Sequence, residues 1–145
     1  MHFKFSQNDK NRILEAIQDA EKQTSGEIRV HADSKCSGDP IQTAISHFER
    51  LKMHETKDRN GVLIYIATRD RKLAIIGDQN INEKVSSDYW ETTKNNLITS
   101  FKKGEYVNGI TVAIADVGEK LKAHFPYLSD DTDELANDLS IGEGK

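Results

Sequence analysis

The fold is decided by the stretch NGVLIYIA, residues 60–67. A turn-forming Asn-Gly pair precedes an uninterrupted apolar run of strand length, which predicts a strand that is buried on both faces. The polar link TRDR (residues 68–71) follows, and then a second apolar run, KLAIIG, at residues 72–77. Because the link is short, we expect the two runs to form an antiparallel hairpin with the first strand at the centre of the sheet.

Residues 27–32 predict another strand, because apolar and polar side chains alternate along them. Glu27, Arg29 and His31 share one face of this strand. Between the two strands, Asp39-Pro40 is typical of a helix start, and apolar residues then recur at helical spacing. Such a strand–helix–strand unit is almost always right-handed and joins two parallel strands.

Three further helices are expected to cover the sheet. The first begins after Ser6, whose hydroxyl can cap it, and the others lie within residues 87–103 and 107–124. The element order predicts an α/β protein, a three-layer α/β/α sandwich that is Rossmann-like. Its small mixed sheet combines a βαβ crossover with an antiparallel hairpin, and the domain should occupy residues 1–127.

The composition of the 145-residue chain, 36% hydrophobic and 30% charged, is that of an ordinary globular domain. Residues 128–145 hold six acidic side chains, one basic one and few large apolar residues. We therefore expect a disordered acidic tail that is dispensable for folding. Residues 1–127 hold 18 acidic and 19 basic side chains, a balance that predicts no surface for nucleic acid or an anionic membrane.

The sequence predicts a cytoplasmic monomer without a transmembrane segment. Its longest apolar run, residues 62–67, is far shorter than the roughly 20 residues that cross a bilayer. The first residues lack the apolar region of a secretory signal. The single Cys36 cannot form an internal disulfide, which fits a reducing compartment.

Common catalytic motifs are absent from the sequence. It has no phosphate-binding glycine loop, no G-x-S-x-G, no H-E-x-x-H and no C-x-x-C. The five histidines show no metal-ligand spacing, so we expect them at the surface or in ordinary hydrogen bonds.

Three strings stand out instead: TSGEIRV (24–30), RNGVLIYIA (59–67) and AIIGD (74–78). With shorter matches downstream, the chain resembles the TPM-domain family over roughly residues 6–127. The resemblance implies an α/β/α sandwich that binds a divalent cation, usually Ca²⁺, with Mg²⁺ or another divalent ion as alternatives. It also links the chain to membrane-protein maintenance and to an acid phosphatase activity. Two features of the chain depart from the family. Its expected cytoplasmic location differs from that of the many members that are secreted or membrane-tethered. In addition, Gln79-Asn80 stands where a glycine commonly follows the acidic residue, here Asp78.

Four carboxylates are predicted to meet at one edge of the sheet and to bind the cation: Glu27, Asp58, Asp78 and Asp88. The two parallel strands begin at this edge and the antiparallel strand ends there. Hard cations such as Ca²⁺ prefer several oxygen ligands, and Asn60 can add an amide oxygen. Each carboxylate also has a structural alternative, because Glu27 can pair with an arginine and the aspartates can serve in a turn, a loop cap and a helix start.

The opposite edge of the sheet is the competing location for a site. It lies beyond the carboxyl ends of the parallel strands, where α/β proteins often bind ligands, and it holds Asp33, Thr68 and Asp70.

Two functions fit these residues. The first is a calcium-binding accessory module of the TPM type, whose bound cation shapes a surface for a protein partner in protein maintenance or assembly. The alternative is a metal-dependent acid phosphatase that hydrolyses phosphomonoesters. In that mechanism Asp78 or Asp88 would serve as the base and Arg59 would bind the phosphoryl group.

Overall fold

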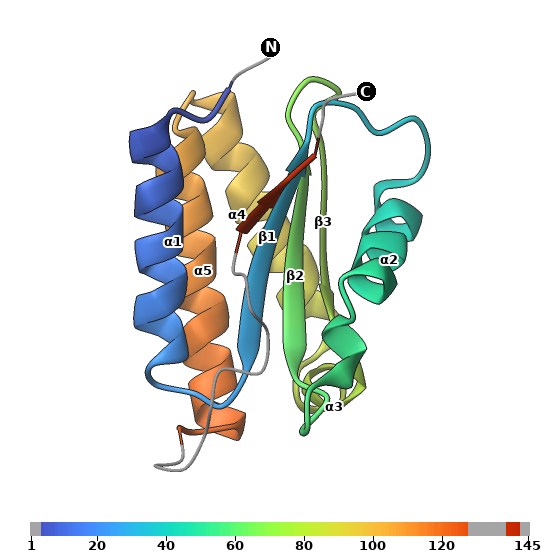
Figure 1. Cartoon of the computed structure of the whole chain (residues 1–145), viewed down its shortest axis with the longest axis vertical. Helices are drawn as coiled ribbons and strands as arrows, with labels where there is room; N and C mark the ends of the chain where they lie inside the picture. Colours follow the sequence, from blue (N-terminus) through green and yellow to red (C-terminus); the bar gives the residue numbers. More distant parts are fainter. Residues whose placement is uncertain (1–3, 128–138, 143–145) are drawn as a thin grey trace.

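Strands β1 (Glu27–Asp33) and β2 (Gly61–Ala67) run parallel in the middle of a four-stranded sheet. β3 (Lys72–Gly77) is antiparallel to β2, and the short β4 (Leu139–Ile141) pairs parallel with β1, which gives the order β3-β2-β1-β4. The computed structural model describes residues 4–127 and 139–142 (Figure 1). The predicted parallel crossover and antiparallel hairpin are both confirmed.

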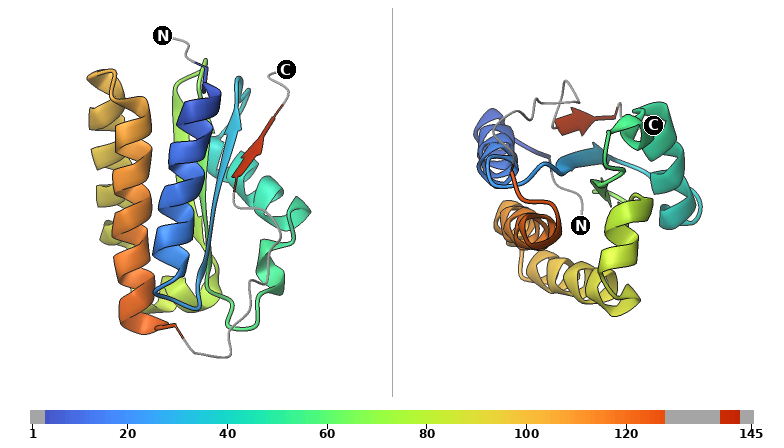
Figure 2. Two further views of the ribbon diagram at one scale, coloured as in Figure 1. Left: turned by 60° about the vertical axis from the view of Figure 1, so that its left-hand side comes forward. Right: turned by 90° about the horizontal axis from the view of Figure 1, so that it is seen from below.

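Helices form a layer on each face of the sheet (Figure 1). One layer consists of α1 (Gln7–Glu21), α4 (Ser87–Lys102) and α5 (Tyr106–His124), and the other of α2 (Pro40–Arg50) with the short η1 (Met53–Glu55). α3 (Gln79–Lys84) follows β3 at one end of the sheet, and the view from below separates the layers (Figure 2). The predicted three-layer α/β/α sandwich is confirmed. Among the helices of the described residues, none is long and apolar enough to cross a membrane.

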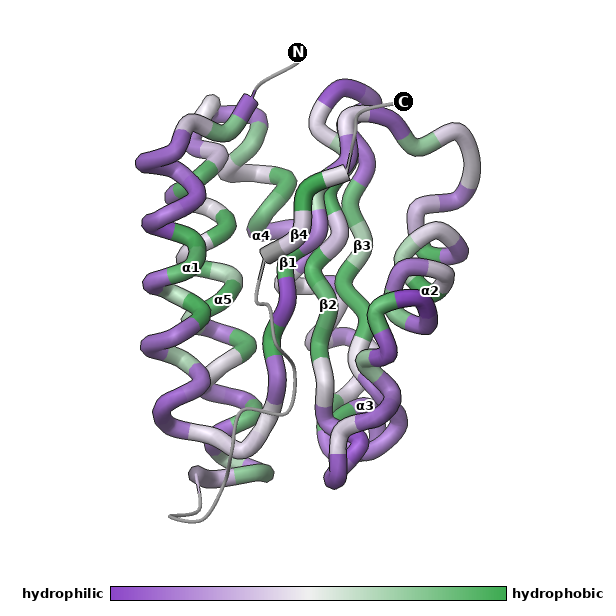
Figure 3. Tube along the Cα trace, viewed as in Figure 1, coloured by the Kyte–Doolittle hydropathy of each residue, from purple (hydrophilic) through white to green (hydrophobic). Residues whose placement is uncertain are grey.

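Apolar side chains form one cluster on each face of the sheet. Val62, Ile64 and Ile66 of β2 belong to the larger cluster, under α1, α4 and α5, whereas Leu63 and Tyr65 belong to the smaller one, under α2. Successive residues of β2 thus serve the two clusters alternately, which explains its uninterrupted apolar run. The hydrophobic segments accordingly follow the strands and the inner sides of the helices (Figure 3).

Two helix starts confirm the predicted caps. The backbone N–H of Asp9 donates to Ser6 Oγ at 3.0 Å, and the N–H of Ser6 donates to Asp9 Oδ2 at 2.9 Å, which forms a capping box. Asp39 Oδ1 accepts the N–H of Ile41 at 3.0 Å, with Pro40 at the first position of α2. The second cap fixes where α2 begins, and Ala44 and Phe48 of this helix pack toward the sheet.

Three elements, η1, α3 and β4, are not predicted from the sequence. α3 begins directly after Asp78, whose Oδ1 accepts the N–H of Gln79 at 2.7 Å, and with six residues it is too short to show helical periodicity. β4 lies in the segment that was predicted to be a disordered tail, so residues 139–141 differ from that prediction. Its residues pair with the otherwise open edge of β1, a long-range contact that composition cannot reveal. Tail residues 128–138 and 143–145 lie outside the described part of the chain.

Candidate metal centre

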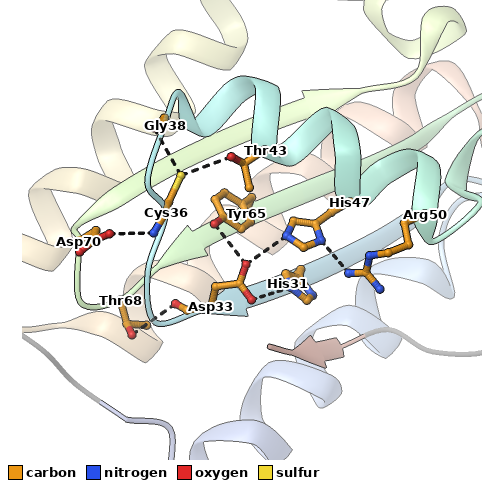
Figure 4. Close-up of polar contacts among 10 residues, drawn as sticks. All are labelled: His31, Asp33, Cys36, Gly38, Thr43, His47, Arg50, Tyr65, Thr68 and Asp70. Carbon is orange, nitrogen blue, oxygen red and sulfur yellow. Dashed lines mark hydrogen bonds and ion pairs between the residues drawn. The ribbon is translucent and has the colours of Figure 1, made fainter. Parts of the chain in front are cut away.

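The carboxylate of Asp33, at the end of β1, joins two histidines and a tyrosine (Figure 4). Its Oδ1 lies 3.0 Å from Nε2 of His31, and its Oδ2 lies 3.0 Å from Nε2 of His47. Tyr65 donates its O–H to the same Oδ2 at 3.2 Å. In residues 4–127 and 139–142, His31, Asp33 and His47 form the one group of three or more His, Cys, Asp or Glu residues whose ligand atoms lie within 4.8 Å of one another.

β1, β2 and α2 position these side chains. His31 and Asp33 are two residues apart on a strand and therefore point to the same face, which lies under α2, the helix that carries His47. Tyr65 lies beside His31 in the parallel register of β1 and β2. The imidazole centroids of His31 and His47 are 4.1 Å apart, so a single small ligand can contact both rings.

Burial favours the uncharged forms of His31 and Tyr65 beside Asp33. It lowers the pKa of His31 below the ordinary value of 6.5, and the attraction of the Asp33 carboxylate opposes this shift less strongly. Burial likewise raises the pKa of Tyr65, so the phenol keeps its proton and donates a hydrogen bond to Asp33. The Nδ1 atom of His31 is buried and has no hydrogen-bond partner among the residues that the structure describes. A neutral imidazole is the form that binds metals.

Arg50 selects the tautomer that a neutral His47 adopts. Its Nη2 lies 2.6 Å from Nδ1 of His47, and because a guanidinium can only donate, Nδ1 must be the acceptor. A neutral His47 therefore carries its proton on Nε2, which points at Asp33. A metal bound at Nε2 would displace that proton and would also meet the positive charge of Arg50.

Loops after β1 and β2 are tied together beside the cluster. The N–H of Thr68 donates to the backbone oxygen of Asp33 at 2.8 Å, and the N–H of Cys36 donates to Asp70 Oδ2 at 2.8 Å. Lys72 Nζ donates to the backbone oxygen of Cys36 at 2.9 Å. Of the residues proposed for this competing edge, Asp33 is thus at the centre of the cluster, whereas Thr68 and Asp70 hold its loops.

The C-terminal segment passes directly beside Asp33. Ser140 of β4 lies next to His31 and accepts a hydrogen bond from Arg29 Nη1 at 3.0 Å. The N–H of Gly142 donates to the backbone oxygen of Ala32 at 2.7 Å. A Cβ atom at position 142 would clash with Oδ1 of Asp33, so glycine is required at this close approach.

Comparison with known proteins gives the family. The sequence model of the TPM domain matches residues 4–120. The chain belongs to the TPM-domain family. No curated protein matched the sequence.

Two solved structures extend the comparison. This TPM domain is similar to the NMR structure of the BA42 protein from the psychrophilic bacterium Bizionia argentinensis, with 42% identity, a TM-score of 0.88 and 98% of each chain covered. It also resembles the N-terminal domain of the cg2496 protein from Corynebacterium glutamicum, with a TM-score of 0.65, over 91% of this chain and 82% of that one. That second match has 16% identity and bears on the fold alone.

The carboxylates predicted to bind the cation in this TPM domain lie in separate settings. Asp78 is buried and accepts two hydrogen bonds from Arg59, from Nε at 2.8 Å and from Nη2 at 2.9 Å. The same aspartate caps α3, so the structural alternative of a loop cap is confirmed for it. The side-chain hydrogen bond to Asp78 raises the pKa of Arg59, and the negative charge of Asp78 adds to this shift.

Glu27, Asp58 and Asp88 complete the predicted set. Glu27 is buried at the start of β1, and Asp88 is exposed in the first turn of α4, where a carboxylate favours the positive end of the helix dipole. The backbone oxygen of Asp58 accepts Nδ2 of Asn80 at 2.7 Å. Within the described ranges, no three of the four predicted carboxylates bring oxygens within 4.8 Å of one another. Asn60 is fully buried nearby, and its Oδ1 has no hydrogen-bond partner in the described part of the chain.

His31 and His47 are candidate ligands that the sequence does not predict. Metal-binding spacings lie within one element, whereas this group combines two residues of a strand with a helix residue 14 positions after Asp33. The sequence does contain one signal. His31 and Asp33 share a face of the predicted strand, and His47 lies on the crossover helix that follows this strand.

Proposed function

We propose that this TPM domain is a divalent-cation-binding module and that His31, Asp33 and His47 hold the cation. The observation that carries the proposal is the group of two imidazoles and one carboxylate with ligand atoms within 4.8 Å of one another. Two nitrogens and one oxygen suit Zn²⁺ and similar transition metals, whereas Ca²⁺ takes six to eight oxygen ligands. The donor set therefore favours a zinc-type cation over calcium.

The surroundings of the three ligands support this assignment. Asp33 already draws both Nε2 atoms to within 3.0 Å of its oxygens, so a cation would need only small side-chain movements to replace these hydrogen bonds. Burial favours the neutral, metal-binding form of His31. Three protein ligands leave a coordination position open for water or another ligand.

Calorimetric titration with Zn²⁺ tests the proposal. His47→Ala removes one half-buried ligand on α2 and should weaken zinc binding at least tenfold, about 1.4 kcal/mol. His54→Ala is the matched control, because His54 is exposed on η1 and contacts only Glu55 at 3.8 Å among the ion pairs described. Equal zinc affinity of the His47→Ala and His54→Ala proteins would show that the ion binds elsewhere.

Calcium binding at the opposite edge, through Glu27, Asp58, Asp78 and Asp88, stays a prediction. The orphan Oδ1 of Asn60 supports an oxygen ligand there, but the double hydrogen bond from Arg59 already neutralises Asp78. A backbone NMR titration with Ca²⁺ separates the two edges. Shifts at residues 58–61 and 77–81 that Asp78→Asn removes would support the calcium site, and shifts confined to the surroundings of Asp33 would assign calcium to the histidine group.

A metal-dependent phosphatase is the second candidate function. The feature that favours it is Arg50, whose guanidinium lies beside His47 at the edge of the proposed cation site. A cation with an open position can activate water, and an adjacent arginine can bind a phosphoryl oxygen. Zinc-dependent hydrolysis of p-nitrophenyl phosphate that disappears in His47→Ala would support this function, and equal hydrolysis in that variant would eliminate it.

A further inference from the structure

A cavity of about 510 Å³ lies on the opposite face of the sheet from α2. It opens where the hairpin between β2 and β3 meets the C-terminal end of α4 and the turn into α5. None of His31, Asp33 and His47 lines it, so it is separate from the proposed cation site. Its size falls within the range of about 300 to 1,000 Å³ that is usual for small-molecule sites.

The interior of this cavity is apolar. Leu73 and Ile98 contribute aliphatic side chains, and the rings of Phe101 and Tyr106 meet edge to face with centroids 5.3 Å apart. The space is left open partly because of Gly104, which has φ +76° in the turn after α4 and no side chain to fill it. A Cβ atom at position 104 would meet nothing within 4 Å.

Among the described residues, the charged side chains that line the cavity are all cationic. They are Arg71 from the hairpin and Lys102 and Lys103 from the end of α4, and no aspartate or glutamate of residues 4–127 or 139–142 lines it. Long basic side chains can place their alkyl stems on apolar surface while the charged ends stay in water. A ligand that matches these walls has an apolar body and one negative end.

We propose that this cavity binds a free monocarboxylic acid with a medium-length alkyl chain. The chain lies against Leu73, Ile98 and Phe101, and the carboxylate faces Arg71 and Lys103. A small polar anion would leave the apolar walls uncovered, and a neutral hydrocarbon would make no use of the three cations.

Decanoate titrated into the full chain, with amide NMR shifts as the readout, tests the site. We expect shifts in residues 67–73 and 98–106 and none around Asp33, with the same affinity in the presence of Zn²⁺. Ile98→Trp fills the cavity without disturbing a fully buried side chain and should abolish binding. Arg71→Gln with Lys103→Gln should weaken binding about fivefold, roughly 1 kcal/mol. The matched control, Lys84→Gln with Lys122→Gln, removes two exposed charges elsewhere and should bind as the parent does.

Several outcomes would overturn the proposal. Decanol binding as tightly as decanoate would show that the cations play no part, and unchanged decanoate affinity in Ile98→Trp would place the ligand elsewhere. Recruitment to phosphatidylglycerol vesicles without any binding of free decanoate would identify a membrane surface instead of a free acid.

Discussion

Replacing Asp33 by Asn tests the centre of the histidine group directly. The carboxylate faces three polar partners, at 3.0 Å from His31, 3.0 Å from His47 and 3.2 Å from Tyr65. A hydrogen bond to a charged group contributes about 1.5 to 3 kcal/mol, and one between neutral groups about 0.5 to 1.5 kcal/mol. The loss is therefore about 1 kcal/mol per contact. Because contacts that share one side chain are not additive, we expect Asp33→Asn to lower the free energy of unfolding of the metal-free protein by about 2 kcal/mol.

The assay is thermal unfolding of the parent and Asp33→Asn, each with and without Zn²⁺. About 2 kcal/mol corresponds to a melting temperature that is lower by about 6 °C for a domain of this length. Zinc at a hundred times its dissociation constant should stabilise the parent by about 2.7 kcal/mol. If the variant binds a hundredfold more weakly, the same zinc concentration stabilises it by only about 0.4 kcal/mol.

Asp19→Asn serves as the matched control, because Asp19 is exposed on α1 and contacts Lys22 at a distance of 3.9 Å. It should unfold within about 0.5 kcal/mol of the parent and respond equally to zinc. If Asp33→Asn matched this control in both measurements, Asp33 would be neither the centre of the polar cluster nor a metal ligand, and the reasoning would be refuted.

Three further perturbations address other parts of the structure. Burial lowers the pKa of His31, so as the pH falls the unfolded chain gains a proton there before the folded protein does. The urea midpoint should therefore fall as the pH drops below about 6.5, and His31→Phe should flatten that dependence. Arg50→Gln removes a positive charge beside His47 and should raise zinc affinity severalfold in calorimetry; weaker binding would assign Arg50 a supporting role. Ending the chain at residue 138 removes β4 and should lower the free energy of unfolding by about 1 to 3 kcal/mol, whereas an unchanged urea midpoint would restore the prediction of a dispensable tail.

The layers of the fold are predictable because their signals are local. The apolar run in β2, the alternation in β1 and the Asp39-Pro40 helix start each depend on neighbouring residues, and together they determine the crossover. β4 gives no comparable signal, since three residues form a strand only because the edge of β1 is open beside them.

The candidate site is less accessible to sequence reasoning, because it depends on distances between elements. The prediction grouped acidic residues by sheet edge, but Arg59 reaches Asp78 and forms an ion pair that no spacing rule specifies. The approach of His47 to Asp33 depends on how α2 is rotated over the sheet, which the packing of Phe48 and Ala44 in the smaller cluster determines. The histidine group lies at the edge that was the competing location, beyond the carboxyl ends of β1 and β2. Of the three residues predicted there, only Asp33 belongs to the group.

The close approach of Gly142 to Asp33 places the end of β4 directly beside the proposed cation site. The N–H of Gly142 is held by Ala32, one residue before the carboxylate, so the segment cannot swing away from Asp33 without detaching from the sheet. If a cation reaches Asp33 past this segment, cation binding and release of β4 share one motion, and hydrogen exchange of the Gly142 amide should report it. Gly142→Ala adds a methyl group at this close approach and should loosen the attachment of β4. The variant should bind zinc faster than the parent if cation binding and release of β4 are coupled, and at the same rate if they are not.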